Sequence, residues 1–101
     1  MFYRIPRSQA ELGLSRTQFY DQITRGLVTR PIKIGARAAA HPAHEIEILA
    51  KARTAGLSDD EIKRLVDRLH AQRDAMAAEL RDESWRSWAS TARPLKESFD
   101  A

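Results

Sequence analysis

The chain has 101 residues, 43% hydrophobic and 31% charged, which suits one small domain with a modest core and excludes a multidomain enzyme. It contains no cysteine, which excludes disulfide bonds, thiolate zinc sites and cysteine nucleophiles. No apolar run reaches the length of a membrane-spanning helix, and the first residues lack the pattern of a signal peptide. We therefore expect a cytoplasmic protein with no membrane contact.

The net charge of +3 is unevenly distributed along the chain. Residues 1–41 carry seven Lys or Arg and two Asp or Glu, a net charge of +5. Residues 42–101 carry ten Lys or Arg and twelve Asp or Glu, a net charge of −2. A basic first part followed by a mildly acidic remainder indicates one surface for a polyanion and another surface for a different partner.

Two short helices are predicted in the basic part. Pro6 fits the first turn of a helix, where its missing N–H removes no hydrogen bond, and Gly13 is expected to end that helix. Ser15 and Gln18 have the spacing of a capping box, which predicts the start of a second helix. Gly26 supplies the left-handed residue with which many helices end.

A β-hairpin is predicted between the second helix and residue 41. Residues 32–34 alternate apolar and charged side chains, and Gly35-Ala36 is expected to form a two-residue type II′ turn, which favours glycine at its first position. The returning segment, residues 37–40, is poor in β-forming residues. The prediction of a hairpin therefore depends mainly on the first strand and the turn.

Two more helices are predicted in the second part of the chain. Pro42 begins one helix and Gly56 ends it. Residues 58–61 form a second capping box, and the helix that follows meets no breaker before residue 83. Roughly 25 helical residues would extend about 37 Å. Residues 84–101 are expected to form a flexible C-terminal tail.

The two short helices and the hairpin together predict a winged helix-turn-helix. A helix fits the major groove of DNA, and its first residues reach the edges of the bases. Phe19 and Ile23 are four positions apart and are expected to turn inward, so the other face of the second helix points outward. That face carries side chains able to hydrogen-bond to bases or phosphates, namely Arg16, Thr17, Gln18, Tyr20 and Asp21.

Basic residues accompany the predicted hairpin. Lys33 and Arg37 flank its turn, where a wing would contact the phosphate backbone or enter a minor groove. Arg25 and Arg30 are further candidates for phosphate contacts. The hairpin therefore adds a second, sequence-independent contact to the predicted DNA-binding surface.

Several of these residues form the motifs of a known family. The motifs are Arg4-Ile5-Pro6, Leu12-Gly13-Leu14-Ser15-Arg16-Thr17, Tyr20, Arg25-Gly26, Pro31-Ile32-Lys33-Ile34-Gly35 and Arg37. In this combination, over about residues 4–55, the chain resembles the AlpA-type regulators and excisionases of phages and integrative elements. The resemblance implies a MerR-like winged helix-turn-helix that associates with the nucleoid of a bacterial cell.

The resemblance also implies a function beside a site-specific integrase. The protein would be an excisionase, or recombination directionality factor, whose copies bind repeated sites on double-stranded DNA, associate with one another and bias the integrase toward excision. The alternative is a transcriptional regulator of an integrase promoter or another promoter of the mobile element. A further alternative is a protein-interaction adaptor that works through its long helix, against which the charge of +5 in residues 1–41 argues.

The chain departs from the family pattern at three positions. Gln22 stands where the family usually has an apolar residue, and we expect it to face solvent. Ala36 replaces a second glycine in the turn, which makes the turn slightly less free. His41 replaces a tryptophan, so the sequence does not establish how the local core is packed.

The long helix carries an apolar stripe with a spacing of three and four residues, interrupted by Arg73. The stripe consists of Ile62, Val66, Leu69, Met76 and Leu80. One interpretation is that it packs onto residues 1–56, and the other is that it forms an interface with a second copy or with an integrase. Trp85 and Trp88 are likewise either interface anchors or residues that fold back onto the chain.

The expected organisation is a mainly α protein with three parts. Residues 1–56 form the DNA-binding domain, residues 57–83 form a long helix that packs or self-associates, and residues 84–101 form the tail. Simpler interpretations of the same residues stay open. The second helix would then be a well-capped surface helix, and Tyr20 would be a half-buried core residue. The basic residues of the hairpin would be charges on an edge strand that prevent aggregation.

Neither a metal site nor an enzyme is expected. His41 and His44 have no cysteine nearby, and the second histidine of a zinc-protease helix is replaced by Ile48. The sequence shows no phosphate-binding glycine loop and no pairing of a nucleophile with a base. We therefore expect no catalytic residues, no metal and no cofactor.

Overall fold

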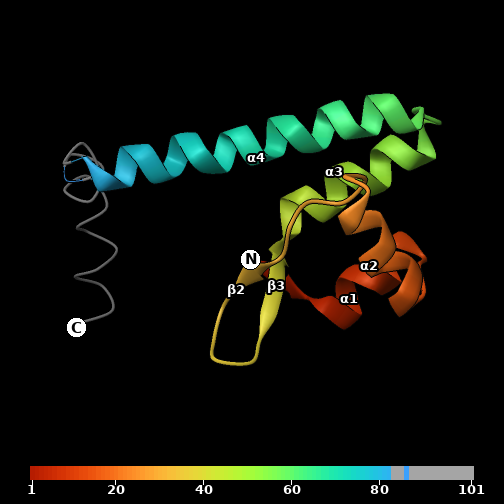
Figure 1. Ribbon diagram of the computed structural model, residues 1–101, viewed down its shortest axis with the longest axis horizontal. Helices are drawn as coiled ribbons and strands as arrows, with labels where there is room; N and C mark the ends of the chain where they lie inside the picture. Colours follow the sequence, from red (N-terminus) through yellow and green to blue (C-terminus); the bar gives the residue numbers. More distant parts are fainter. Residues whose placement is uncertain (83–85, 87–101) are drawn as a thin grey trace, which may run out of the picture. The chain divides into compact units, whose positions relative to one another are not determined.

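The computed structural model describes residues 1–82 and Arg86, which form a mainly helical structure with a three-stranded antiparallel sheet (Figure 1). In chain order the elements are β1 (Phe2–Arg4), α1 (Ile5–Leu12), α2 (Arg16–Thr24), β2 (Ile32–Lys33), β3 (Ala39–Pro42), α3 (Ala43–Thr54) and α4 (Asp59–Arg81). The chain divides into two units after His70, and the first, Met1–His70, contains every element up to the start of α4. The predicted mainly helical domain with a hairpin and a long C-terminal helix is confirmed at this level.

The helix ends follow the signals in the sequence. The Ser15 hydroxyl accepts a hydrogen bond from the Gln18 backbone N–H at 3.2 Å, and Gln18 Oε1 accepts one from the Ser15 N–H at 3.0 Å. The predicted capping box is therefore present, and Ser58 and Glu61 form a second one at the start of α4. α1 ends at Gly13, whose φ of 67° is left-handed, as predicted.

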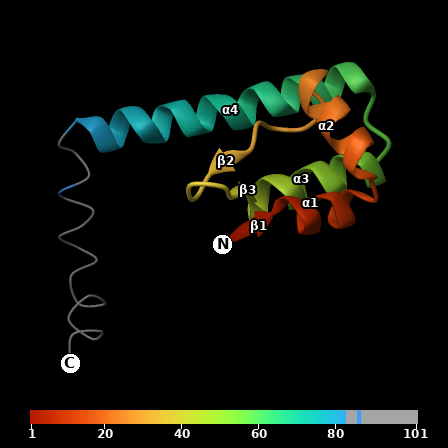
Figure 2. The same ribbon diagram turned by 60° about the horizontal axis from the view of Figure 1, so that its bottom comes forward.

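The sheet has the strand order β1-β3-β2 and includes one strand with no counterpart among the predicted elements. β1 pairs with β3 so that Tyr3 lies opposite His41, and β2 pairs with β3 so that Lys33 lies opposite Ala39. β1 escapes prediction because it has three residues, of which one is buried, too few to establish an alternating pattern. Figure 2 shows α1 alongside α3, with the sheet at one end of both helices.

The turn of the hairpin differs from the predicted one. The Ile34 N–H donates to the Ala38 carbonyl at 3.0 Å, so three residues, Gly35, Ala36 and Arg37, connect this pair instead of two. Gly35 does not have the positive φ that a type II′ turn requires at its first position. The prediction of a two-residue turn is wrong, and Arg37 lies within the loop rather than on the returning strand.

The core of the first unit joins α2, the segment before the hairpin, α3 and the start of α4. Its buried residues are Phe19, Leu27, Val28, Leu49, Ala52, Ile62, Val66 and Leu69. Burial of these side chains removes apolar surface from water, which is the main favourable contribution to folding. The start of α4 is therefore part of the core of the first unit.

This packing corrects the predicted self-association surface. Ile62, Val66 and Leu69 are 5%, 1% and 2% exposed, so they contact their own chain and are not available to a second copy. Met76 and Leu80 are 58% and 52% exposed. The predictions for the tail and for Trp85 and Trp88 concern residues outside the described part of the chain.

The structure places His41 and Gln22, two of the positions at which the chain differs from the AlpA-type pattern. His41 is fully buried, its ring meets the Phe19 ring edge-to-face at 5.5 Å, and its Nε2 donates a hydrogen bond to the Thr29 carbonyl at 2.7 Å. It thus fills core space and also satisfies a backbone group. Gln22 is half-buried, and its buried Oε1 accepts no hydrogen bond from the described residues, so the expectation that it faces solvent is wrong.

Candidate nucleic-acid interface

The exposed face of α2 carries the residues that the sequence assigned to DNA recognition. Phe19 is fully buried and Ile23 is half-buried against the core, which fixes the orientation of the helix. The residues on its outer side are all exposed, namely Arg16, Thr17, Gln18, Tyr20 and Asp21. Their exposure agrees with the prediction, while their contact with DNA stays a prediction.

Gln18 has a double role at the start of α2. Its Oε1 is occupied by the Ser15 N–H in the capping box. The amide nitrogen of the same side chain keeps two N–H donors, because the capping bond uses the oxygen alone. Capping and donation to a base or a phosphate are therefore compatible in one side chain.

Tyr20 and Arg16 form a pair on the outer side of α2. The Arg16 guanidinium carbon lies 5.7 Å from the centre of the Tyr20 ring, within the range of a cation–π contact. The Tyr20 ring also meets Phe19 edge-to-face at 6.0 Å and is 41% exposed. Tyr20 thus links the core to an exposed arginine, which limits the positions that the Arg16 side chain adopts.

Asp21 and Arg25 form an ion pair one turn apart on α2. The Asp21 Oδ2 lies 3.7 Å from the Arg25 Nη1, and both side chains are more than half exposed. An exposed pair of this kind contributes little to stability. It does neutralise part of the negative charge that Asp21 would otherwise present to a phosphate backbone.

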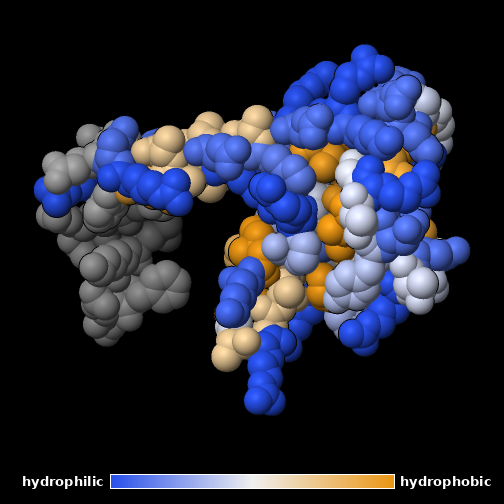
Figure 3. Space-filling model, viewed as in Figure 1, coloured by the Kyte–Doolittle hydropathy of each residue, from blue (hydrophilic) through white to orange (hydrophobic). Residues whose placement is uncertain are grey.

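The hairpin contributes a basic projection. Lys33, on β2, and Arg37, in the loop, are both exposed. Figure 1 shows the loop directed away from α3, and Figure 3 shows strongly hydrophilic side chains around it, beside residues of intermediate hydropathy. The hairpin is anchored at its start, because the backbone N–H of the exposed residue Arg30 donates to Nε2 of His70 at 3.1 Å.

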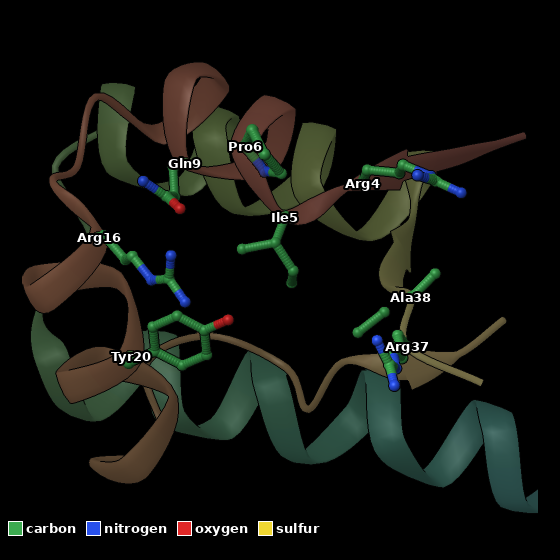
Figure 4. A pocket seen from close by; sticks show the side chains of 9 residues that line it. Arg4, Ile5, Pro6, Gln9, Arg16, Tyr20, Arg37 and Ala38 are labelled. Carbon is green, nitrogen blue, oxygen red and sulfur yellow. The ribbon is translucent and has the colours of Figure 1, made fainter. Parts of the chain in front are cut away.

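A groove connects α2 to the hairpin, and we call it the arginine groove. Its volume is about 280 Å³, and its lining comprises Arg4, Ile5, Pro6, Gln9, Arg16, Tyr20, Arg37, Ala38 and Ala39. Figure 4 shows Arg16 and Tyr20 reaching from α2 toward Ile5, while Arg4 comes from β1 and Arg37 from the hairpin loop. The lining contains three arginines and no carboxylate.

Arg4 lines this groove but is not among the residues that the sequence predicted for DNA binding. The residue belongs to a recognised motif, but its place beside the hairpin depends on β1, which pairs Arg4 with Ala40. The basic character of residues 1–41 was the available signal, and it does not identify which arginine lies near α2. The strand pairing supplies that information.

Two partly buried contacts connect the elements that carry this site. The Tyr3 hydroxyl donates to Glu47 Oε1 at 3.0 Å, and this hydrogen bond to a carboxylate raises the pKa of Tyr3 above its ordinary value. The Arg53 guanidinium donates to the Leu27 carbonyl at 3.0 Å, and burial lowers the pKa of Arg53. The first contact ties β1 to α3, and the second ties α3 to the segment that leads into the hairpin.

Residues 1–82 and Arg86 contain no group of three or more His, Asp or Glu side chains placed to hold a metal ion. Within the same residues, no helix has the length and apolar character needed to cross a membrane.

Comparison with known proteins identifies neither a family nor a function for this chain. No family model matches the chain, and neither a curated protein nor a solved structure is similar to it at a significant level.

Proposed function

We propose that the chain is a sequence-specific double-stranded DNA-binding protein with a MerR-like winged helix-turn-helix. One observation carries the proposal: the exposed polar face of α2 and the basic hairpin are joined by a groove lined by three arginines and no acid. A protein helix fits the major groove of DNA, and arginine and lysine side chains contact phosphates on either side of it. The net charge of +5 in residues 1–41 supports the same assignment.

DNA binding is tested by footprinting on DNA from a mobile element, together with affinity measurements at increasing salt. We expect a protected site and an affinity that falls steeply with salt, because each phosphate contact releases counterions. A chain that binds no duplex at low salt contradicts the proposal. Salt-independent binding to a protein partner, without binding to DNA, indicates the adaptor instead.

We further propose that the protein acts as an excisionase, or recombination directionality factor, for a site-specific integrase. This assignment is supported by the resemblance to AlpA-type proteins and by the small size of the DNA-binding module. One such module reads few base pairs, so several copies on adjacent sites would supply the specificity. The exposed apolar residues Met76 and Leu80 are the available candidates for contact between copies.

A recombination assay tests this role. Purified integrase, element DNA and increasing amounts of the protein should give more excision product than integrase alone. Unchanged excision, accompanied by altered expression from a promoter–reporter fusion, indicates a transcriptional regulator.

The variant Leu80→Glu should lower cooperative binding to adjacent sites without loss of folded protein, since the Leu80 side chain is half exposed. Unchanged cooperativity in that variant excludes Leu80 from the contact between copies.

A further inference from the structure

We propose that the arginine groove binds one strand of the DNA backbone, with Arg4 and Arg16 as phosphate-binding residues. The inference rests on the proposed DNA-binding function and assigns two roles beyond it. Arg4 becomes a DNA contact, although it lies outside both the recognition helix and the hairpin. Arg16 becomes a backbone contact, so the reading of bases falls to its neighbours Thr17 and Gln18.

The first step in the argument is geometric. A single backbone strand separates the major groove of a duplex from the adjacent minor groove. If α2 occupies the major groove and the hairpin contacts the adjacent minor groove, that strand has to pass between them. The space between α2 and the hairpin is the arginine groove, because its lining includes Arg16 and Tyr20 on one side and Arg37, Ala38 and Ala39 on the other.

The second step is the chemistry of the lining. Arg4, Arg16 and Arg37 come from β1, α2 and the hairpin loop, so the arginines of the lining belong to three different elements. A guanidinium matches the geometry of a phosphate with two parallel N–H donors and stays charged at any physiological pH. The absence of a carboxylate among the lining residues leaves this charge without compensation inside the groove.

The third step is the charge at the ends of the helices. α1 begins with Ile5 and α2 begins with Arg16, and both of these residues line the groove. Neither helix has an acidic residue in its first turn, whereas α3 has Glu45 there and α4 has three acids, Asp59, Asp60 and Glu61. Acidic side chains stabilise the positive end of a helix. α1 and α2, whose first residues line the groove, have no such acidic side chains, so their N-termini are available to an external anion such as a phosphate.

The fourth step concerns how firmly the two arginines are placed. Arg4 follows Tyr3, which is buried and donates a hydrogen bond to Glu47. The strand that carries Arg4 is therefore tied to α3 by Tyr3 and paired with β3. Arg16 is held over the Tyr20 ring, and Figure 4 shows its guanidinium directed into the groove. A side chain that is held in this way, as Arg16 is, loses less entropy when it binds a phosphate.

The test compares Arg4→Ala and Arg16→Ala with the matched control Arg7→Ala. Arg7 is three residues from Arg4 and its removal gives the same change in net charge, but it contacts Tyr3 and Glu11 and does not line the groove. Circular dichroism establishes that each variant is folded. Fluorescence anisotropy then measures affinity for a footprinted site and for a random duplex over a range of KCl concentrations.

We expect Arg4→Ala and Arg16→Ala to weaken binding about tenfold on both duplexes, which is the size of a charged hydrogen bond. Each should lower the slope of log affinity against log salt by about 1. Arg7→Ala should change affinity by less than about threefold, because it alters the long-range field without loss of a contact. Arg4→Lys should keep the salt slope and lose part of the affinity, because it keeps the charge without the paired donors.

A scan of the duplex with single neutral methylphosphonate linkages identifies the phosphates concerned. Wild-type protein should lose affinity at the linkages that occupy the groove, and Arg4→Ala should no longer lose affinity at one of them. If Arg4→Ala and Arg7→Ala behave alike while the wild type binds DNA, the inference fails and the proposed function stands. If Arg16→Ala weakens only the footprinted site, Arg16 reads a base and its assignment to the backbone is overturned.

A small anion is the competing occupant of the groove. Inorganic phosphate, titrated into the free protein, should shift the Arg4 and Arg16 side-chain NMR signals only weakly and without saturation below tens of millimolar. Tight, saturable phosphate binding, combined with unchanged duplex affinity in Arg4→Ala, would assign the groove to a small anion and overturn the inference. Failure of the wild type to bind any duplex overturns the proposed function itself.

Discussion

Gln18 shows how one residue serves both the fold and the candidate interface. Its side-chain oxygen closes the capping box with Ser15, while its amide N–H groups stay available on the exposed side of α2. A glutamate at this position keeps the capping oxygen, because the capping box accepts Glu as well as Gln. It also replaces the donor with a negative charge.

We therefore predict that Gln18→Glu separates stability from DNA binding. The free energy of unfolding, measured in urea, should stay within about 0.5 kcal/mol of the wild type, because the cap is retained. Affinity for duplex DNA should fall at least tenfold, because a carboxylate then faces the phosphates and bases. Wild-type affinity in a folded Gln18→Glu variant excludes the start of α2 from the interface.

Gln22 presents the opposite case, a polar residue whose side-chain oxygen is buried. Its buried Oε1 has no hydrogen-bond donor among the described residues, and such a group lowers stability by about 1–3 kcal/mol. Gln22→Leu should raise the free energy of unfolding by about 1 kcal/mol, measured by urea denaturation. A destabilised Gln22→Leu variant means that the side chain has a polar partner, such as water.

The residues of α2 also show what sequence reasoning reaches and where it stops. The capping box and the inward direction of Phe19 follow from spacing alone, and both are observed. The burial of Gln22 does not follow, because an amide on a helix next to the apolar face is compatible with solvent or with the core. The contact of Arg16 with the Tyr20 ring depends on side-chain conformation, which spacing does not determine.

At the scale of elements, the position of the hairpin could be predicted from the sequence, but the length of its loop could not. The alternation over residues 32–34 and the glycine after it identify the first strand and the turn. The length of the loop depends on which backbone groups pair across the strands, and several pairings fit the same residues. β3 also pairs with β1, and this partner fixes its position independently of the turn.

The three-residue loop leads to a prediction about Gly35. Because its φ is not positive and an added Cβ would lie 3.8 Å from the Ala38 Cβ, Gly35→Ala should leave the free energy of unfolding within about 0.5 kcal/mol of the wild type. Gly13→Ala is the matched comparison, because Gly13 has open space around it but a φ of 67°. That variant should lose about 1–2 kcal/mol. An equally large loss at Gly35 supports the type II′ turn instead.

The helix α4 combines a buried start with an exposed continuation. Leu69→Ala should lower the free energy of unfolding by about 2–5 kcal/mol, because Leu69 is 2% exposed and belongs to the core cluster. Met76→Ala, at a residue that is 58% exposed, should change it by less than about 0.5 kcal/mol. Chemical denaturation of both variants measures the difference. Equal effects of the two substitutions contradict the packing of α4 described here.

In α4, the apolar stripe could be recognised from the sequence, but the surface against which it packs could not. Spacing of three and four residues identifies the face that is buried, and packing and self-association both require such a face. Ile62, Val66 and Leu69 are buried with α2 and α3 residues, which decides the question for the first part of the stripe. For Met76 and Leu80, self-association stays a prediction.

At the scale of the whole molecule, we propose that the basic first part of the chain binds DNA and that the mildly acidic remainder does not. The basic residues 1–41 contain α1, α2 and the hairpin, whereas α3 and the first turn of α4 carry the acids at their N-termini. A polyanion is attracted to the first group and repelled by the second. The class of partner stays a prediction from charge and motif, whereas the groove between α2 and the hairpin is seen only in the folded chain.

The most direct test of this claim is a heteronuclear NMR titration of the protein with its footprinted duplex. Backbone and side-chain signals of the exposed face of α2, of residues 33–37 and of Arg4 should shift and saturate together. Signals from the exposed positions of α3 and from the first turn of α4 should stay in place. Saturable shifts confined to α3 and α4, with the α2 and hairpin signals unmoved, would show that the DNA-binding surface lies elsewhere.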